Sequence, residues 1–255
     1  MPSFRFFASA LFALALCGAP AIASAQSFSE PQRGEIEKIV RDYLLAHPEV
    51  LEEVSAELSK RQTAAEALKH EAAVTKNAQA IFNSPRGVTV GNKDGDVSFV
   101  EFFDYNCGYC KRAMTDMLEL MKLDPKLKVV LKEFPVLGPG SVEAAQVAVA
   151  VRMQDPTGKK YLDFHQKLLG GRGQADKARA LAAAKEAGLD MAKLEKDLTS
   201  PEVRATLEEN FKLAEEMGMN GTPSYVIGKQ VVIGAVGVDS LKEKIGIARC
   251  GKATC

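Results

Sequence analysis

The Cys107-Gly108-Tyr109-Cys110 motif constrains the fold most, because it follows an apolar run and opens a helix-like stretch. Val97 to Phe103 has the composition of a buried strand, and Cys107 to Lys122 has the pattern of a helix. A cysteine at a helix start faces unsatisfied N–H groups and the positive end of the helix dipole. Both stabilise the thiolate, which attacks disulfides and is the better leaving group. The motif therefore predicts a reactive Cys107, with Cys110 as the cysteine that resolves a mixed disulfide.

A zinc site and a structural disulfide are the other interpretations of such a pair. A zinc site would need two further ligands, and the remaining cysteines and the histidines at 47, 70 and 165 have no familiar second-half spacing. A purely structural disulfide is disfavoured, because cysteine pairs at helix starts are usually reactive. We therefore expect redox chemistry with no metal ion and no cofactor.

The first 25 residues have the features of a secretory signal peptide. Arg5 supplies the positive start, Phe6 to Leu16 is apolar, and Ala23-Ser24-Ala25 offers small residues for cleavage. Residues 1–25 are therefore expected to be removed, near Ala25, from an exported protein. An export site such as the periplasm allows disulfides to form and persist.

Removal of the signal peptide leaves four cysteines in two close pairs. The second pair, Cys250 and Cys255, encloses a very short loop, and closing it would add only about 2 kcal/mol on the chain-entropy model. A structural disulfide is the expected role of this pair. A secondary redox pair and a thiolate metal site remain as alternatives.

Residues 26–82 are expected to form an N-terminal helical segment for oligomerisation or linkage. Apolar residues recur at three- and four-residue steps before Pro48, which ends one helix and opens another that continues to about Phe82. The two apolar stripes are Ile36, Ile39, Val40, Tyr43 and Leu44, then Val50, Leu51, Val54 and Leu58. So narrow a stripe must pack on the main domain or on another copy of the chain, and both options stay open.

The remainder, residues 83–255, alternates between strand and helix signals, which predicts an α/β sheet with a helical insertion at about 138–218. The expected strands besides Val97–Phe103 are Val88–Val90, Lys128–Phe134, Ser224–Ile227 and Gln230–Ile233, and the last helix is Asp239–Ala248. The formal net charge is zero, which offers no basic surface for nucleic acid.

The run from Phe99 to Cys110, followed far downstream by Gly221-Thr222-Pro223, resembles the DsbA-type branch of the thioredoxin superfamily. The resemblance implies a thioredoxin fold with an inserted helical subdomain, preceded by the N-terminal helical segment. It also implies a cis bond between Thr222 and Pro223 against the active-site cysteines. The family's buried acid falls on Glu101, where a carboxylate could exchange protons with Cys110, although a charged residue at a strand edge is the alternative.

Two features depart from the plainest DsbA pattern. Gly108-Tyr109 stands where strong oxidants have Pro-His, and it is similar to the dipeptide of the DsbC-type isomerases. The run Tyr43 to Leu51 resembles the N-terminal region of suppressor-of-copper-sensitivity protein C (ScsC), which in that family drives self-association. The ScsC-like resemblance implies a protein disulfide isomerase or reductase, with a DsbA-type dithiol oxidase as the alternative.

The same resemblance implies the partners of the protein. Its substrates would be unfolded or misoxidised exported proteins, and a membrane redox protein of the DsbD/ScsB or DsbB type would restore the starting state. A homo-oligomer through the N-terminal helices is expected. A different class of function, copper tolerance, would use the thiolates of Cys107 and Cys110 to bind Cu(I), because soft sulfur ligands select that ion.

Overall fold

The computed structural model describes residues 28–255, so the expected signal peptide lies outside the described residues. The chain divides into two units, one ending at Leu58 and the other running from Ser59 to Cys255. Among the helices of the described residues, none combines the length and the apolar character needed to cross a membrane.

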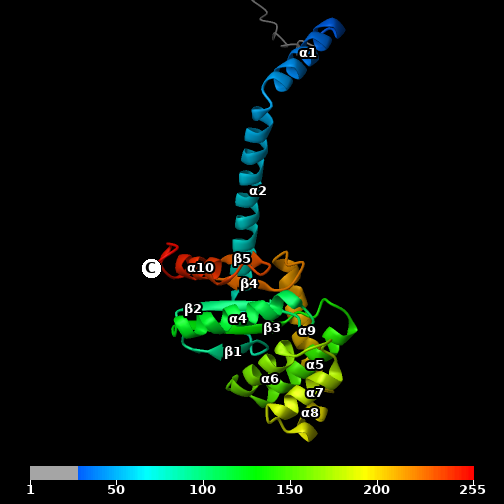
Figure 1. Ribbon diagram of the computed structural model, residues 1–255, viewed down its shortest axis with the longest axis vertical. Coiled ribbons are helices and arrows are strands. Elements are labelled where there is room, and N and C mark those ends of the chain that lie inside the picture. Colours follow the sequence, from blue (N-terminus) through cyan, green and yellow to red (C-terminus); the bar gives the residue numbers. More distant parts are fainter. Residues whose placement is uncertain (1–27) are drawn as a thin grey trace, which may run out of the picture. The chain divides into compact units, whose positions relative to one another are not determined.

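Helix α1 (Glu30–Ala46) and the beginning of helix α2 (Glu49–Lys76) make up the described part of the first unit (Figure 1). The two helices meet at Pro48, where the sequence predicted the break. Their apolar stripe is exposed rather than buried, and its exposed members are Ile36, Ile39, Val40, Tyr43, Leu51, Val54 and Leu58.

The second unit contains a mixed sheet whose strand order is β1-β3-β2-β4-β5. The strands are β1 (Val88–Gly91), β2 (Val97–Phe103), β3 (Leu127–Glu133), β4 (Ser224–Ile227) and β5 (Gln230–Ile233). Strands β2 and β3 are parallel and are joined by helix α4 (Gly108–Leu123), whereas the other neighbouring pairs are antiparallel. This arrangement confirms the predicted α/β fold.

The central strand β2 is buried on both faces of the sheet. Phe99 and Phe103 pack in the cluster that includes residues of α4 and of helix α10 (Val238–Cys250). Val100 and Phe102 point to the opposite face, where they pack with Val74 and Ile81. Because successive side chains of a strand alternate between faces, Glu101 lies on the same face as α4.

The end of α2 and helix α3 (Ala78–Phe82) belong to the sheet-containing unit. The sequence placed a boundary at residue 82 after one continuous helix, but α2 ends at Lys76 and the two units divide after Leu58. The helix is interrupted at Asn77, whose side chain donates to the Ala73 carbonyl at 3.0 Å and to the Glu216 carboxylate at 2.6 Å. Such side-chain bonds compete with helical backbone geometry.

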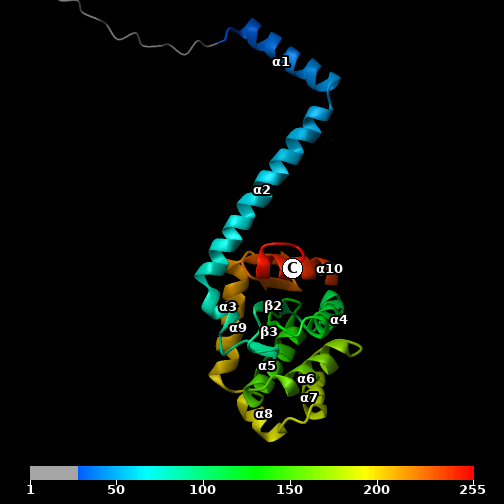
Figure 2. The ribbon, with the colours of Figure 1, turned by 90° about the vertical axis from the view of Figure 1, so that its left-hand side faces the viewer.

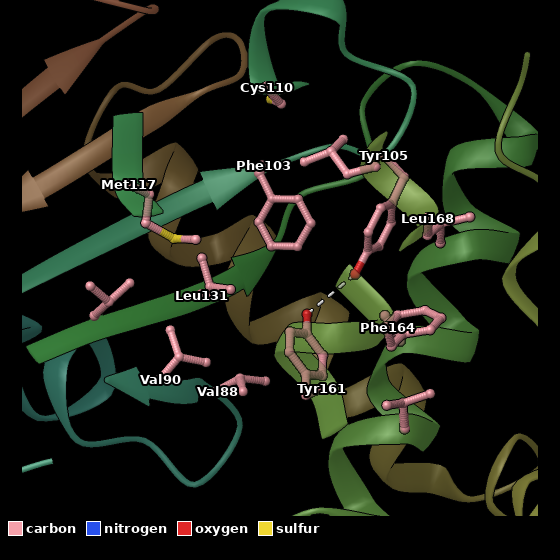
Figure 3. Packing of buried hydrophobic residues seen from close by; sticks show 14 of the residues in the cluster. Val88, Val90, Phe103, Tyr105, Cys110, Met117, Leu131, Tyr161, Phe164 and Leu168 are labelled. Atoms are coloured by element: carbon pink, nitrogen blue, oxygen red, sulfur yellow. Dashed lines mark hydrogen bonds between the residues drawn. The ribbon is translucent and has the colours of Figure 1, made fainter. Parts of the chain in front are cut away.

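Five helices lie between β3 and β4 in this part of the chain, and they occupy the region where the sequence predicted an insertion. They are α5 (Pro139–Gln154), α6 (Lys159–Gly170), α7 (Lys177–Glu186), α8 (Met191–Asp197) and α9 (Pro201–Glu216). Helices α5 to α8 gather at one end of the second unit (Figure 2). They join the sheet through aromatic packing, in which Phe103 and Tyr105 meet Tyr161 and Phe164 of α6 (Figure 3).

Candidate active site

Cys107 occupies the N-cap position of α4, with extended backbone angles. Its sulfur accepts a hydrogen bond from the backbone N–H of Cys110 at 3.4 Å. On its other side the sulfur lies 3.2 Å from the Thr222 carbonyl oxygen, and the Thr222–Pro223 peptide bond is cis. The start of α4 and the loop before β4 therefore meet at the Cys107 sulfur.

The pKa of Cys107 is lowered from 9.0 to about 5. The largest cause is the hydrogen bond from the Cys110 thiol, which stabilises the thiolate. The Thr222 side chain and the backbone N–H groups of Tyr109 and Cys110 act in the same direction, whereas partial burial opposes them. At neutral pH Cys107 is therefore a thiolate, which is the nucleophilic form.

Cys110 has the opposite character. It is fully buried, and its pKa is raised because its thiol donates to Cys107, because burial disfavours the charged form, and because Glu101 and Cys107 repel a further negative charge when they are ionised. Both sulfurs are free in this structure. The site thus pairs an ionised sulfur, on a residue that is 5% exposed, with a protonated sulfur on a residue that is fully buried.

Glu101 lies on β2 with only 2% of its surface exposed. Burial raises the pKa of its carboxyl to about 8, and the charges of Asp116 and Cys107 add to this shift. The register of the sheet places Glu101 opposite Tyr225 of β4 and beside Leu131 of β3. The alternative of an ordinary exposed charge at a strand edge does not fit this burial.

Asp104 and Asn106 hold the loop that leads into Cys107, and the sequence analysis gave neither a role. One Asp104 oxygen accepts the N–H of Asn106 at 2.8 Å, and the other accepts those of Val136 and Leu137 at 2.8 and 2.9 Å. The Asn106 amide accepts the N–H of Ala175 at 2.7 Å and donates to its carbonyl at 2.9 Å. The only signal in the sequence was two polar residues next to the motif.

The two residues between the cysteines differ in their surroundings. The Tyr109 side chain is 60% exposed, and the guanidinium carbon of Arg112 lies 5.3 Å from the centre of its ring. A Cβ added at Gly108 would meet no atom within 4 Å. Neither residue is fixed by packing, so both are open to substitution.

A second cluster of buried polar side chains lies apart from the two cysteine sulfurs. Its members are Tyr105, Glu133, Tyr161 and His165. The Tyr161 hydroxyl donates to Glu133, and the Tyr105 and Tyr161 hydroxyls lie 3.5 Å apart (Figure 3). His165 is also buried, and burial lowers its pKa to about 3, so it is neutral at physiological pH. Burial raises the pKa of the Glu133 carboxyl, which favours a protonated, uncharged acid.

Cys250 and Cys255 form a disulfide at the C-terminal end of α10. Both residues are exposed. Within residues 28–255, no group of three or more histidine, cysteine, aspartate or glutamate side chains is arranged to hold a metal ion.

The family model described as "DSBA-like thioredoxin domain" matches residues 99–246, more than half of the chain. The model described as "Copper resistance protein ScsC N-terminal domain" matches residues 32–65. Among curated proteins, the chain is 27% identical over 169 residues to disulfide bond formation protein D of Bacillus subtilis, covering 61% of this chain and 74% of that protein.

The chain also matches a sodium/proton antiporter of Salinispora arenicola, at 23% identity over 163 residues. This match covers 63% of the chain but only 24% of the antiporter, and the chain spans 26% of a second antiporter, from Herminiimonas arsenicoxydans. The chain therefore spans about a quarter of the length of these two relatives.

Two solved structures are similar over most of their own length. A thioredoxin-like oxidoreductase from Silicibacter pomeroyi is 42% identical, with a TM-score of 0.63, and the match covers 67% of this chain and 96% of that chain. A linker-deletion mutant of Proteus mirabilis ScsC is 30% identical, with a TM-score of 0.65, over 88% of this chain and 98% of that chain. With the family models and the paired cysteines at a helix start, these matches show that the chain belongs to the DSBA-like thioredoxin domain family.

Proposed function

We propose that this protein is an exported thiol-disulfide oxidoreductase that acts on protein disulfides, as an isomerase or reductase rather than a net oxidase. One observation carries the proposal, namely the thiolate of Cys107 at the N-cap of α4, next to Cys110 and the cis Thr222–Pro223 bond. Membership of the DSBA-like family supports the same reaction class.

In the proposed reaction, the Cys107 thiolate attacks one sulfur of a substrate disulfide, and the other substrate sulfur leaves as a thiolate. The mixed disulfide then has two fates. Cys110 attacks the Cys107 sulfur and releases a reduced substrate, or another substrate cysteine attacks and a rearranged disulfide forms. The ionised form of Glu101 accepts the proton that Cys110 must lose before it attacks, because a pKa of about 8 leaves a fraction of this carboxyl ionised near neutral pH and makes that fraction a strong base.

The preference for isomerisation rests on the dipeptide and on self-association. Gly108-Tyr109 contains no histidine to stabilise the Cys107 thiolate further, so the disulfide form is a weaker oxidant than one with Pro-His. The exposed apolar stripe of α1 and early α2 overlaps the part that matches the ScsC N-terminal domain. We propose that the stripe joins copies of the chain, since apolar surface of this extent is usually covered in solution.

Export, partners and substrates follow from the same proposal. The mature protein would work in the periplasm on unfolded or misoxidised exported proteins. A membrane redox protein of the DsbD/ScsB type would keep the cysteines reduced for isomerisation, and one of the DsbB type would keep them oxidised for the alternative, a dithiol oxidase. The relation to periplasmic relatives such as a thioredoxin-like protein of Salmonella enterica supports this location.

Refolding of a scrambled, multi-disulfide protein tests the proposal. The mature wild type should restore activity to the scrambled substrate, and Cys107→Ser should not, because it lacks the nucleophile. A variant with Cys250→Ser and Cys255→Ser is the matched control, and it should retain refolding activity if that disulfide is structural. Equal refolding by wild type and Cys107→Ser would contradict the assignment.

Deletion of residues 26–58 tests the oligomer. The mature protein should sediment as an oligomer, and the truncated protein should sediment as a monomer that still reacts with small disulfides. A monomeric mature protein would overturn self-association and remove the main argument for isomerase over oxidase.

Binding of Cu(I) is the second candidate function, and the family model named for a copper resistance protein favours it. Cys107 and Cys110 would supply two sulfur ligands, of which Cys107 is already ionised. A Cu(I) titration of wild type and Cys107→Ser separates the candidates. Tight binding by wild type together with no refolding activity would favour copper binding.

A further inference from the structure

The hydroxyl of Tyr225 is buried without a hydrogen-bond partner among the described residues. Tyr225 is 1% exposed and lies opposite Glu101 in the antiparallel pairing of β2 and β4, so both side chains lie on the sheet face that α4 covers. Leaving a buried hydroxyl unpaired destabilises the fold, and phenylalanine would fill nearly the same volume without that cost. The hydroxyl therefore calls for an explanation other than packing.

The charges that act on this hydroxyl belong to groups at or near the active site. Its pKa is raised first by burial and then by the charges of Glu101, Cys110, Asp116 and Cys107. The same Asp116 raises the pKa of Glu101. The charges of these groups therefore influence one another, and the pairing of β2 with β4 places Glu101 and Tyr225 on the sheet face under α4.

Asp116 differs from the other members of this group because it reaches solvent. It lies on α4 at the edge of the buried stripe and is half-buried. Its carboxyl forms no hydrogen bond or salt bridge with the rest of residues 28–255. Its pKa is raised by burial and by Glu119, and the charge of Arg112 opposes this.

Cys110 and Glu101 have no comparable route to solvent. They are 0% and 2% exposed, and the strand neighbour of Glu101 on β3 is the apolar Leu131. The buried residues that α10 places over this face, Leu241 and Ile245, are apolar as well. A proton that leaves Cys110 must still reach water, because each cycle of oxidation and reduction moves it out and back.

We propose that Asp116 and the Tyr225 hydroxyl pass protons between solvent and the buried pair Glu101 and Cys110. The inference rests on the proposed oxidoreductase function. In the resolving step, the Cys110 thiol gives its proton to the ionised form of Glu101 and attacks the Cys107 sulfur. The new disulfide forms as the bond from Cys107 to the substrate sulfur breaks, and the substrate leaves as a thiolate with that electron pair. Glu101 then releases the proton past Tyr225 to Asp116 and water, and reduction runs the path in reverse.

Stopped-flow reaction of the reduced mature protein with dithionitrobenzoate separates the two steps, because each attack releases one coloured thiolate. The first phase reports attack by Cys107, and the second reports resolution by Cys110. Asp116→Asn and Tyr225→Phe should leave the first phase unchanged. Each substitution should slow the second phase about tenfold at neutral pH. This effect is smaller than the roughly 100-fold that a positioned proton acceptor contributes, because Glu101 itself is retained.

Glu243→Gln is the matched control, since it removes an exposed carboxylate from α10, the other helix that packs on this face of the sheet. It should leave both phases at the wild-type rate. Added imidazole buffer should restore the second phase of Asp116→Asn, because a small buffer can carry the proton in place of the side chain. A wild-type second phase in both Asp116→Asn and Tyr225→Phe would overturn the proposal, and so would a slow phase of Asp116→Asn that buffer does not restore. Absence of the first phase in wild type would instead overturn the oxidoreductase function.

Discussion

The sulfur of Cys107 lies 3.2 Å from the carbonyl oxygen of Thr222, so the reactive cysteine is held between the start of α4 and the loop before β4. This contact brings together residues 115 positions apart in the chain. It leaves the sulfur in reach of the N–H groups that open α4 and next to the loop on which a substrate chain would lie. The electrostatic consequences of this position can be measured directly.

The Cys107 thiol should titrate with a pKa of about 5 in the reduced, folded protein. The hydrogen bond from the Cys110 thiol is the main cause, so Cys110→Ala should move the titration towards 9. The rate of alkylation by iodoacetamide, followed against pH, measures the value. In Cys107→Ser this fast alkylation should vanish. A wild-type midpoint near that of an ordinary thiol would contradict the assigned nucleophile.

The stability of the reduced protein should rise, relative to the oxidised protein, as pH increases from about 5 to 9. In this range the folded protein has lost the Cys107 proton while the unfolded chain still holds it, so the unfolded state binds more protons and stability increases with pH. Below about pH 5 both states are protonated and the contribution is lost. The oxidised protein has no such thiol. Urea unfolding of both redox forms at several pH values measures the difference.

Glu101 acts on stability in the opposite direction. Its folded pKa of about 8 lies above the ordinary 4.5, so the folded state binds the extra proton and stability falls as pH rises between these values. The comparison of redox forms should therefore be repeated in Glu101→Gln, where only the Cys107 contribution remains. If the difference in unfolding free energy between the reduced and oxidised forms of Glu101→Gln did not change with pH, the low pKa of Cys107 would be contradicted.

The paired substitution Gly108→Pro and Tyr109→His should make the protein a stronger oxidant. Space around Gly108 is open, and proline suits the first turn of a helix, so the fold should be retained. A histidine beside the Cys107 thiolate would stabilise the reduced form and raise the reduction potential by roughly 30 mV for each tenfold change in equilibrium constant. Equilibration with glutathione measures the potential. Tyr109→Gln is the control, and an unchanged potential in the paired variant would contradict the argument.

Much of the sheet could be predicted from the sequence because its strands are apolar runs bounded by turn residues. The limits of β2, β4 and β5 agree with the predicted Val97–Phe103, Ser224–Ile227 and Gln230–Ile233. The end of the N-terminal helical segment was harder to predict from the sequence. Its position depends on Val74 and Ile81, which pack against the far face of β2, and helical periodicity does not reveal such tertiary packing.

Some residues of the active site could be predicted from the sequence, and others could not. Cys107 and Cys110 are set by a local motif, and the resemblance supplied Thr222 and Pro223, which the structure places beside Cys107. The role of Asp104 could not be read from its neighbours, because its partners Val136 and Leu137 lie 32 and 33 residues away. A loop held by distant backbone N–H groups leaves no repeating pattern in the sequence.

Asp104→Ala should lower the free energy of unfolding by about 2–4 kcal/mol, because it removes the buried carboxylate that accepts hydrogen bonds from three backbone N–H groups. Asp104→Asn should cost less, since its remaining carbonyl oxygen can keep some of these bonds. Asp94→Ala, in the exposed turn between β1 and β2, is the control and should change stability by less than about 0.5 kcal/mol. Urea unfolding compares the three variants, and equal losses in Asp104→Ala and Asp94→Ala would contradict the role of the loop.

Substitution of Lys132 and substitution of Glu209 should change stability by different amounts. Glu209 has a second charged partner, Arg86, whereas Glu209 is the one charged partner that the structure gives Lys132 among the described residues. The Lys132 side chain is 0% exposed, and its Nζ lies 3.6 Å from Glu209, which also pairs with Arg86 at 2.9 Å. Lys132→Met leaves Glu209 with Arg86, and replacing a buried charge by an apolar chain of similar volume should change stability by less than about 1 kcal/mol or increase it.

Glu209→Gln instead leaves the Lys132 ammonium buried without its carboxylate and should cost about 3 kcal/mol at neutral pH. Burial lowers the pKa of Lys132 to about 8 from 10.5, so between these values the folded state has lost a proton that the unfolded state keeps. Wild-type stability should therefore rise with pH in this window relative to Lys132→Met. Urea unfolding below and within the window measures both effects. If Lys132→Met lost as much stability as Glu209→Gln, the buried ammonium would be a net source of stability and this account of the pair would be wrong.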